Sequence, residues 1–454
     1  MMKLLAMYPF QETAAKAVER KKRVGFLVYY GGGKTYLSLR WLEELGAEAL
    51  PCLVLCPKTA IVQWGTEIEK FTGFTYSLIE GTPTQRVKAI DEQRQVYVIN
   101  YDAIRGDSIF SALKLKDFKT VIADESTMLK ERRTLRFKRL WSFCCHIPHR
   151  ALLTGRVITE RPEELFAQFL FLDGGETFGR SYWRFRFMYF DEPPPWKPYK
   201  WQLKRGAMEI IAKKFEASCV RVSEKIVSAQ LPPKQYMRIH FDLSLEERAG
   251  YKQLKDEFAL DFPEGGRYET QWVLARSAKM HQLASGFVYR ELDEPLIYNT
   301  RKAEWISENL PEMLLRGPIV IWTSYLVHQV VIELELLAKG FSCSRLNGEM
   351  KQEERQQQLD AFLQGKTDIL LIMEQLGAAA LNLQRTCNAV FADCAYSAAM
   401  RENAEHRTYR IGTAKTVFYY DLVTRRTLDE AVLNAIRDKR EISDAILQHV
   451  RGVE

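Results

Sequence analysis

The sequence predicts an α/β protein built from two successive lobes, each with a parallel sheet covered by helices on both faces. Short apolar runs recur along the first 172 residues, and each ends in a polar or glycine-rich turn that leads into a helical pattern. The same rhythm returns after Gly317-Pro318. Runs of four or five apolar residues without alternation are typical of strands buried on both faces. Ligands bind such sheets at the carboxyl ends of the strands.

The first lobe is predicted over residues 1–172. Its strands are expected at five apolar runs: Gly25–Tyr29, Leu53–Cys56, Val96–Ile99, Thr120–Ala123 and Ala151–Leu153. From 173 to 234 the rhythm breaks, because four prolines interrupt a stretch dense in aromatic and basic residues. We interpret 173–234 as a helical insertion that ends in the rigid connector Leu231-Pro232-Pro233-Lys234. Its rings either pack inward or grip a nucleic acid.

The second lobe is predicted over residues 235–454. A strand is expected at Gln235–Leu243, followed by a helical insertion over about 244–300 with helices at Leu245–Phe258 and Gln271–Ser285. Further strands are expected at the apolar runs Ile319–Trp322, Ile369–Met373, Val390–Asp393 and Val417–Val423. Thr427 and Glu430 have capping-box spacing, so the chain is expected to close with a C-terminal helix.

Composition narrows the class of protein. The 454 residues are 46% apolar, as in globular domains, and no apolar run approaches the about 20 residues that cross a bilayer. The N-terminal apolar stretch is short and lacks a cleavage site, so we expect no signal peptide and a cytoplasmic location. The net charge of +7 permits a polyanionic partner. The eight cysteines include no pair with zinc-knuckle spacing, which favours buried free thiols in a reducing compartment.

A phosphate-binding loop is predicted directly after the first apolar run. Gly31, Gly32 and Gly33 precede Lys34 and Thr35, and a helical pattern follows. Glycines let the backbone wrap closely around phosphates, and a helix N-terminus presents free N–H groups to them. Lys34 is expected to reach the β and γ phosphates, and the Thr35 hydroxyl is expected to bind Mg²⁺.

An acidic pair supplies the second half of this predicted site. Asp124 and Glu125 follow the apolar run Val121-Ile122-Ala123, about 90 residues beyond the phosphate loop. We expect Asp124 to hold Mg²⁺ together with Thr35, and Glu125 to orient and deprotonate the attacking water. The alternative is an ordinary solvated acidic turn, which the position after a buried strand disfavours.

The motifs around these residues resemble the Swi/Snf-related branch of helicase superfamily two, whose two lobes are RecA-like. The matching segments of the first lobe are Tyr8-Pro9-Phe10-Gln11, Leu55-Cys56-Pro57-Lys58, Gln63-Trp64, Ile99-Asn100-Tyr101 and Leu153-Thr154-Gly155. In the family the glutamine of the opening motif reads adenine, so the resemblance implies that Gln11 selects ATP. It also implies that Asn100 and Tyr101 lie near a DNA backbone. Lys58 is a strand-end candidate for a phosphate contact, and Trp64 either supports a DNA-facing loop or packs its helix.

The second lobe carries the remaining motifs in the same order. Ser324 and Tyr325 follow a predicted strand and are candidates for nucleic-acid contacts. The resemblance adds three kinds of site residue: Gly377 for the nucleotide, Asn382 for the nucleic acid, and Arg407 and Arg410 for the phosphates. In the family these arginines face the triphosphate from the opposite lobe, so hydrolysis requires closure of the lobes. An arginine in this role raises the rate by about 10³- to 10⁵-fold.

These features together imply a DNA-dependent ATPase that uses ATP and Mg²⁺ to move along duplex DNA by sequence-independent backbone contacts. We expect a monomer of a bacterial cell or a phage-infected host, with any protein partner left open. Two alternatives remain: a helicase that separates strands of DNA or RNA, and a nucleotide-gated DNA-binding scaffold with little turnover. The second draws on two departures from the family pattern, at Arg156-Val157 and Ala378-Ala379-Ala380. Val28 is a further departure, beside the phosphate loop.

Overall fold

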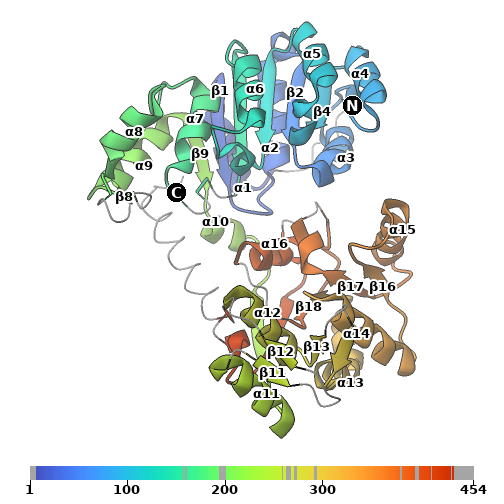
Figure 1. Cartoon of the computed structure of the whole chain (residues 1–454). Coiled ribbons are helices and arrows are strands. Elements are labelled where there is room, and N and C mark those ends of the chain that lie inside the picture. The colour runs from blue at the N-terminus through green and yellow to red at the C-terminus, as the bar shows by residue number, and fades with distance from the viewer. Residues whose placement is uncertain are drawn as a thin grey trace. The chain divides into compact units, whose positions relative to one another are not determined.

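The computed structural model of the chain divides into two compact units, with the boundary between Gln230 and Leu231. Each unit contains one large sheet with helices around it (Figure 1). The structure describes residues 7–155, 157–158, 161–193, 201–257, 259–261, 267–269, 273–290, 294–378, 381–393, 398–410, 412–430 and 432–433.

The first unit holds a seven-stranded sheet in which every neighbouring pair is parallel. In order across the sheet the strands are β3 (Tyr76–Leu78), β4 (Val96–Asn100), β2 (Cys52–Cys56), β5 (Thr120–Asp124), β6 (His149–Thr154), β1 (Arg23–Val28) and β9 (Cys219–Val222). Every residue of β2, β4, β5 and β6 is buried, which confirms that the unalternating apolar runs form strands covered on both faces.

Ten α-helices are described in the first unit: α1 (Pro9–Val18), α2 (Lys34–Leu45), α3 (Ile61–Phe71), α4 (Pro83–Asp91), α5 (Asp107–Leu115), α6 (Leu135–Cys144), α7 (Glu164–Asp173), α8 (Tyr182–Tyr189), α9 (Ala207–Ser218) and α10 (Glu224–Ser228). Short 3-10 turns follow three of the strands: η2 (Lys58–Ala60), η3 (Tyr101–Arg105) and η4 (Ser126–Leu129). A two-stranded ribbon joins β7 (Phe190–Asp191) to β8 (Gln202–Leu203).

The segment expected as an insertion contributes to the first sheet. Its strand β9 pairs with β1, with Gly25 opposite Cys219. A Cβ atom at Gly25 would lie 2.5 Å from the Cys219 sulfur, so the close approach of the two strands requires glycine there. The aromatic residues of α8, which were expected either to pack inward or to grip a nucleic acid, differ in exposure. Phe185 is buried, whereas the Trp183 side chain is 52% exposed.

The second unit holds a six-stranded parallel sheet. Its order is β10 (Lys234–Phe241), β19 (Val417–Thr424), β18 (Asn388–Phe391), β15 (Ile319–Thr323), β17 (Ile369–Met373) and β16 (Ser344–Leu346). The first strand of the unit therefore pairs with its last, over the whole length of both. The strand expected at Val390–Asp393 begins earlier and ends at Phe391. Asp393 lies two residues beyond the strand, and its carboxylate contacts Ser324 and His328.

Alternate residues of this sheet enter two separate cores. Ile319, Ile321 and Leu371 pack into the core on one face, and Val320, Trp322 and Leu370 into the core on the other. Successive side chains of a strand point to opposite faces, so a strand that is apolar at every position requires cover on both sides.

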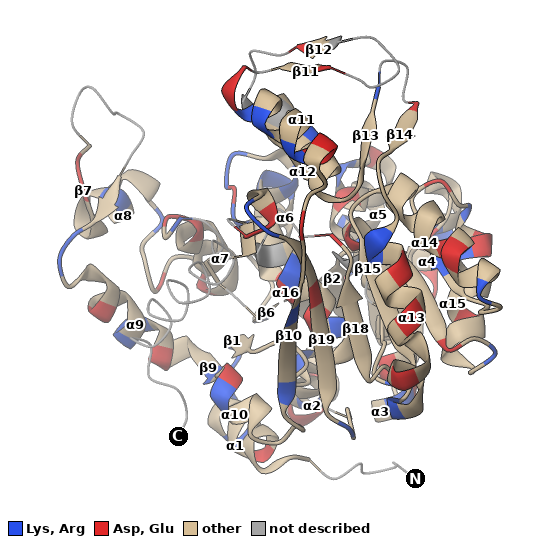
Figure 2. Cartoon of the chain, turned by 90° about the horizontal axis from the view of Figure 1, so that it is seen from below, with Lys and Arg blue, Asp and Glu red and all other residues tan. Residues whose placement is uncertain are grey.

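The helices of the second unit are α11 (Leu245–Asp256), α12 (Val273–Ala284), α13 (Arg301–Arg316), α14 (Leu326–Ala338), α15 (Gln352–Leu363) and α16 (Ala398–Thr408), with the 3-10 turn η6 (Glu374–Ala378) after β17. Two ribbons, β11 (Ala259–Asp261) with β12 (Arg267–Glu269) and β13 (Phe287–Tyr289) with β14 (Pro295–Ile297), lie beside α11 and α12. Figure 2 shows both signs of charge interspersed along α13.

Three sequence-based expectations fall partly or wholly outside the described residues: the C-terminal helix beyond residue 433, Arg156, and Ala379-Ala380. Among the described helices, none combines the length and apolar character that a bilayer span requires. The seven cysteines that the structure describes are free thiols. Burial raises the pKa of Cys219 to about 12, as expected for thiols that pack as small apolar side chains.

Candidate functional site

The glycine-rich loop that the sequence predicts to bind phosphates, called the phosphate loop here, lies between β1 and α2. Gly33 is the N-cap of α2 and has a φ of +87°, a conformation that favours glycine. A Cβ atom at Gly32 would lie 2.6 Å from Cγ1 of Val28, so the valine that departs from the family pattern fills space beside the loop. The α2 helix starts at Lys34, and its first turn has no acidic residue, which leaves its N-terminal N–H groups to an anion.

Gln11 lies against this loop. Its side-chain Nε2 donates to the carbonyl oxygen of Gly32 at 3.2 Å, and its Oε1 accepts from the backbone N–H of Tyr8 at 3.1 Å. A Cβ at Gly33 would lie 2.5 Å from the same Nε2, so the amide fits only against a glycine. Pro9 begins α1 and fixes the turn that carries Gln11. The structure thus brings this segment and the phosphate loop together across 21 positions of sequence.

The acidic pair lies at the carboxyl end of β5, next to the loop. Lys34 Nζ is 3.9 Å from Glu125 Oε1. Glu125 has a φ of +48°, a strained conformation for a residue with a side chain. Asp124 is 8% exposed, and its Oδ1 accepts from the Glu125 N–H at 2.9 Å. Burial, and then the adjacent Glu125 carboxylate, raise the pKa of Asp124 to about 6.

The donor chemistry of this edge suits Mg²⁺. The cation prefers oxygen ligands, and Asp124 supplies a carboxylate while Thr35 supplies a hydroxyl one residue into α2. Burial and the neighbouring negative charge make the ionised form of Asp124 unfavourable. A divalent cation beside the carboxylate would stabilise that ionised form. Among the described residues there is no cluster of three or more histidine, cysteine, aspartate or glutamate side chains placed to hold a metal ion.

Two residues predicted to meet nucleic acid instead contact Asp124. The Trp64 indole Nε1 donates to Asp124 Oδ2 at 2.9 Å, and the Tyr101 hydroxyl donates to the Asp124 backbone oxygen at 2.7 Å. Each side chain is only 1% exposed, so neither is available to a polyanion in this structure. The burial of Trp64 on α3 agrees with packing of its helix, and the hydrogen bond to Asp124 adds a second contact.

The other predicted nucleic-acid contacts of this unit differ in exposure. Asn100 ends β4 and is 6% exposed, and its Oδ1 accepts from Arg86 at 3.2 Å, so Asn100 does not present its amide to solvent. Lys58 begins η2 and is exposed. The Tyr30 ring packs against Gly155, in the turn after β6, so closely that a Cβ atom at Gly155 would lie 2.8 Å from it. The ring therefore connects the phosphate loop with this turn. The Lys34 ammonium lies 4.9 Å from the centre of that ring.

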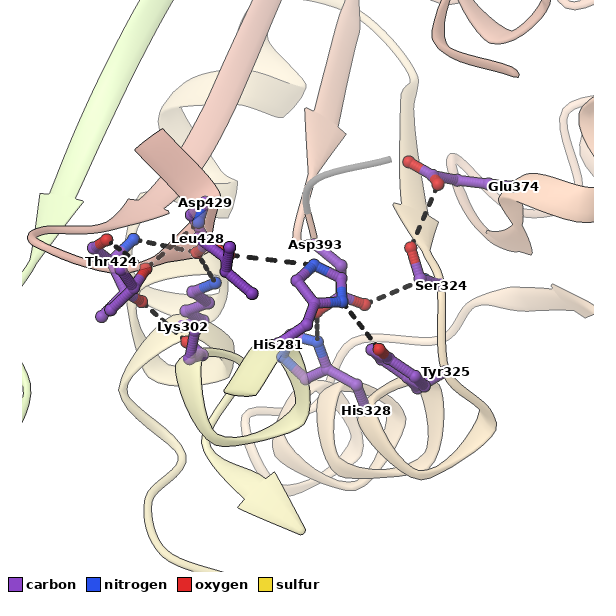
Figure 3. A network of polar contacts seen from close by, with 12 residues as sticks. His281, Lys302, Ser324, Tyr325, His328, Glu374, Asp393, Thr424, Leu428 and Asp429 are labelled. Carbon is purple, nitrogen blue, oxygen red and sulfur yellow. Dashed lines mark hydrogen bonds and ion pairs between the residues drawn. The ribbon is translucent and has the colours of Figure 1, made fainter. Parts of the chain in front are cut away.

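In the second unit, strand-end residues form a buried polar network at the carboxyl edge of the sheet (Figure 3). Ser324 follows β15, its N–H donates to Asp393 Oδ2 at 2.9 Å, and its hydroxyl donates to Glu374 Oε2 at 3.0 Å. Burial, and then repulsion by Asp393, raise the pKa of Glu374 to about 8. Burial opposes ionisation of Asp393 as well, but the charges of His328 and Lys302 outweigh it and hold the pKa of that carboxyl far below its usual range.

The same network engages the inserted helix α12. His281 Nδ1 lies 2.7 Å from the Tyr325 hydroxyl, and its Nε2 lies 3.8 Å from Asp429 Oδ1 (Figure 3). Lys302 from α13 reaches Asp429 Oδ2 at 3.3 Å. Ser324 and Tyr325, which the sequence offered as nucleic-acid contacts, therefore use their hydroxyl groups within the unit. Sequence reasoning did not find Glu374, Asp393 or the two histidines as their partners.

The remaining predicted residues of the second unit lie on neighbouring loops. Gly377 lies in η6, directly after β17. Asn382 is exposed, and its Oδ1 accepts from the N–H of Gln384. Arg407 is the penultimate residue of α16, and its carbonyl oxygen accepts from the Leu383 N–H at 2.9 Å. Arg410 follows that helix and is held by Thr413. One backbone hydrogen bond thus ties the Asn382 loop to the helix that carries Arg407.

A buried ion-pair cluster anchors the start of α16. The Arg401 guanidinium donates to Glu405 at 2.8 Å and to Asp421 of β19, and it lies 3.5 Å from the centre of the Phe391 ring. All three charged groups are buried. The cluster fixes α16 against β18 and β19, and so sets where Arg407 emerges.

Comparisons with known proteins identify the family of the chain. The SNF2-related domain model matches residues 3–300, and the helicase conserved C-terminal domain model matches residues 301–412. The DNA annealing helicase and endonuclease ZRANB3 of Homo sapiens is 24% identical over 468 residues, which cover 97% of this chain and 40% of the relative. Chromodomain-helicase-DNA-binding protein 1-like of Mus musculus is 23% identical over 412 residues, 88% of this chain and 44% of the relative.

A solved structure, the Sulfolobus solfataricus SWI2/SNF2 ATPase core in complex with dsDNA, is 20% identical, covers 97% of this chain and 92% of its own, and has a TM-score of 0.46. The chain spans less than half the length of the two curated relatives described above. The family model nevertheless matches well over half of the chain, across the phosphate loop, the acidic pair and the inserted helix α12. The chain belongs to the SNF2-related family, with a helicase C-terminal domain as its second part.

Proposed function

We propose that this chain is an ATP-driven motor that moves along duplex DNA. The observation that carries the proposal is the arrangement in the first unit, where Lys34 of the phosphate loop lies 3.9 Å from Glu125 and beside the buried Asp124. Such a set provides a cation for the phosphates, a ligand for Mg²⁺ and a base for water. Family membership and the relatives named for helicase activity support the choice of nucleic acid as the track.

Each residue has a separate role in the proposed hydrolysis. Lys34 and the N–H groups at the start of α2 bind the phosphates. Mg²⁺ held by Thr35 and Asp124 would offset the charge of the phosphate oxygens. Glu125 accepts a proton from the attacking water, and its strained backbone holds its carboxylate close to Lys34. Gln11, fixed against Gly32, contacts the adenine ring.

The second unit completes the proposed cycle. Arg407 and Arg410 approach the triphosphate when the units close, and opening after hydrolysis returns them. Gly377 approaches the nucleotide on the same closure. Lys58 and Asn382, both exposed, contact DNA phosphates, which gives binding that is independent of sequence and weakens as salt rises. We propose that the motor works as a monomer in the cytoplasm of a bacterial cell or a phage-infected host.

Steady-state ATP hydrolysis with and without duplex DNA tests the proposal. We expect duplex DNA to raise the turnover number, and Glu125→Gln to abolish turnover while retaining nucleotide binding. Glu209→Gln, which removes an exposed carboxylate of α9, is the matched control and should turn over normally. Wild-type hydrolysis that duplex DNA leaves unchanged would refute the motor. Stimulation accompanied by strand displacement on tailed duplexes would replace translocation with strand separation.

A further inference from the structure

We infer that Trp64 is a positioning residue for the magnesium ligand Asp124, and so sets the affinity of the site for the cation. This inference rests on the proposed function and adds a residue to it. The indole Nε1 donates to Asp124 Oδ2 at 2.9 Å, in an environment where Asp124 is 8% and Trp64 1% exposed. A hydrogen bond to a charged group in such a setting is stronger than one between neutral partners.

The contacts of Asp124 show why the indole matters. Oδ1 accepts from the N–H of Glu125 at 2.9 Å, and the backbone oxygen accepts from the Tyr101 hydroxyl at 2.7 Å. The main chain is therefore fixed by Tyr101 of η3, and one carboxylate oxygen by Glu125, which directly follows β5. The second carboxylate oxygen is fixed by Trp64 alone among the hydrogen bonds that the described residues make to it. With both oxygens held, the carboxylate plane cannot rotate, and its remaining lone pairs keep one direction.

The fold places Trp64 for this role. Trp64 lies in the first half of α3, which follows β2, the neighbour of β5 in the sheet. Pro57 precedes the turn η2, which leads from β2 into α3. The Trp64 side chain therefore extends from α3 to the carboxyl end of β5. A metal ligand held by a group from a different element keeps its orientation when no cation is present. Binding of the cation therefore costs less conformational entropy.

A matched pair of variants tests this inference. Trp64→Phe removes the indole N–H and keeps a ring in the cavity. Trp41→Phe removes an equally buried indole of the same unit, whose Nε1 donates to the backbone oxygen of Lys21 at 2.8 Å. Both variants lose one hydrogen bond of a buried indole and similar packing, so Trp41→Phe controls for a general loss of stability, which thermal unfolding measures for each. Only Trp64→Phe should change the response to Mg²⁺.

The readout is the equilibrium binding of a fluorescent ADP derivative as Mg²⁺ is varied. In Trp64→Phe we expect the Mg²⁺ concentration for half-maximal binding to rise about 10- to 100-fold, the effect typical of losing a partner that orients a metal ligand. Binding in EDTA should not change. A double-mutant cycle with Asp124→Asn should remove the effect, because Trp64 then has no carboxylate to orient. Equal midpoints for Trp64→Phe and Trp41→Phe would overturn the inference.

Two further measurements keep the outcome decisive. If Trp64→Phe does not fold, replacement of the indole by benzothiophene, which keeps the bicyclic shape and lacks the N–H, is measured in the same way. ATP hydrolysis by the wild-type chain is measured beside the binding curves. Absence of wild-type hydrolysis would count against the proposed function, whereas normal hydrolysis with an unshifted midpoint in Trp64→Phe would count against the role of Trp64.

Discussion

The pKa of Glu374 makes the stability of the second unit depend on pH. Burial and the nearby Asp393 raise this pKa from 4.5 to about 8, and Asp421 adds to the repulsion while Arg401 opposes it. Between pH 5 and 8 the folded protein holds the Glu374 proton and the unfolded chain releases it. The unfolding free energy therefore falls as pH rises, because the folded state binds more protons. Glu374→Gln retains a hydrogen-bonding partner for Ser324 and removes the titration.

The magnitude follows from the two pKa values. Over pH 5 to 8, the wild type should lose on the order of 3 kcal/mol of unfolding free energy relative to Glu374→Gln, at 1.36 kcal/mol per pH unit of unequal proton binding. The difference between the two proteins is the observable, since other groups titrate equally in both. Glu308→Gln, an exposed change on α13 of the same unit, serves as the control and should track the wild type.

Pulse proteolysis in urea provides the assay, because fragments identified by mass spectrometry report the second unit separately from the first. Separate reporting is needed since two compact units need not unfold in one transition. Curves for the wild type and Glu374→Gln that stay parallel from pH 5 to 8 would refute the argument, and would mean that Glu374 is ionised in the folded protein or gains a counter-charge as pH rises.

Two further outcomes follow from the structure. Arg401→Met removes the ion-pair partner of the buried Asp421 carboxylate, whereas Glu405 keeps Lys234 at 3.5 Å and the Tyr236 hydroxyl. The substitution should lower the unfolding free energy by about 3–5 kcal/mol in urea titrations; a loss below about 1 kcal/mol would show that the pair contributes little. Gly33→Ala should weaken nucleotide binding at least tenfold in fluorescence titrations, because its Cβ meets a side-chain nitrogen at 2.5 Å. Gly46→Ala has a similar positive φ with nothing within 4 Å and should cost only stability, so equal binding by both variants would contradict this.

The fold class and the positions of strands such as β2 and β15 could be predicted from the sequence because these strands are apolar at successive positions. That pattern requires cover on both faces, and the structure has it. The strand-end rule also identified Asp124 next to the phosphate loop. The same rule applies to Glu374 and Asp393, which each follow an apolar run, and could have found the network of the second unit.

Other features lay beyond sequence reasoning. Trp64 and Asp124 are 60 positions apart, and no periodicity shows that an indole on a helix will reach the end of another strand. The resemblance suggested a role near DNA for Trp64 and Tyr101, and it gave no sign that both side chains are buried and donate hydrogen bonds to Asp124. Pairing of β9 with β1 was likewise missed, because β9 is only four residues long and alternates in burial. Short alternating strands give a weak signal.

The pairing of β10 with β19 has a consequence for synthesis on the ribosome. β10 is the first strand of the second unit to leave the exit tunnel, and its parallel neighbour emerges last. Until then β10 has no partner strand and the edge of β18 that β19 will cover is open, and such unpaired strands are templates for association with other chains. The first unit has all its strands once Val222 has emerged, so it is free to fold while the second still waits. Chains that stop before Val417 should therefore aggregate, whereas chains that stop after Thr424 should not.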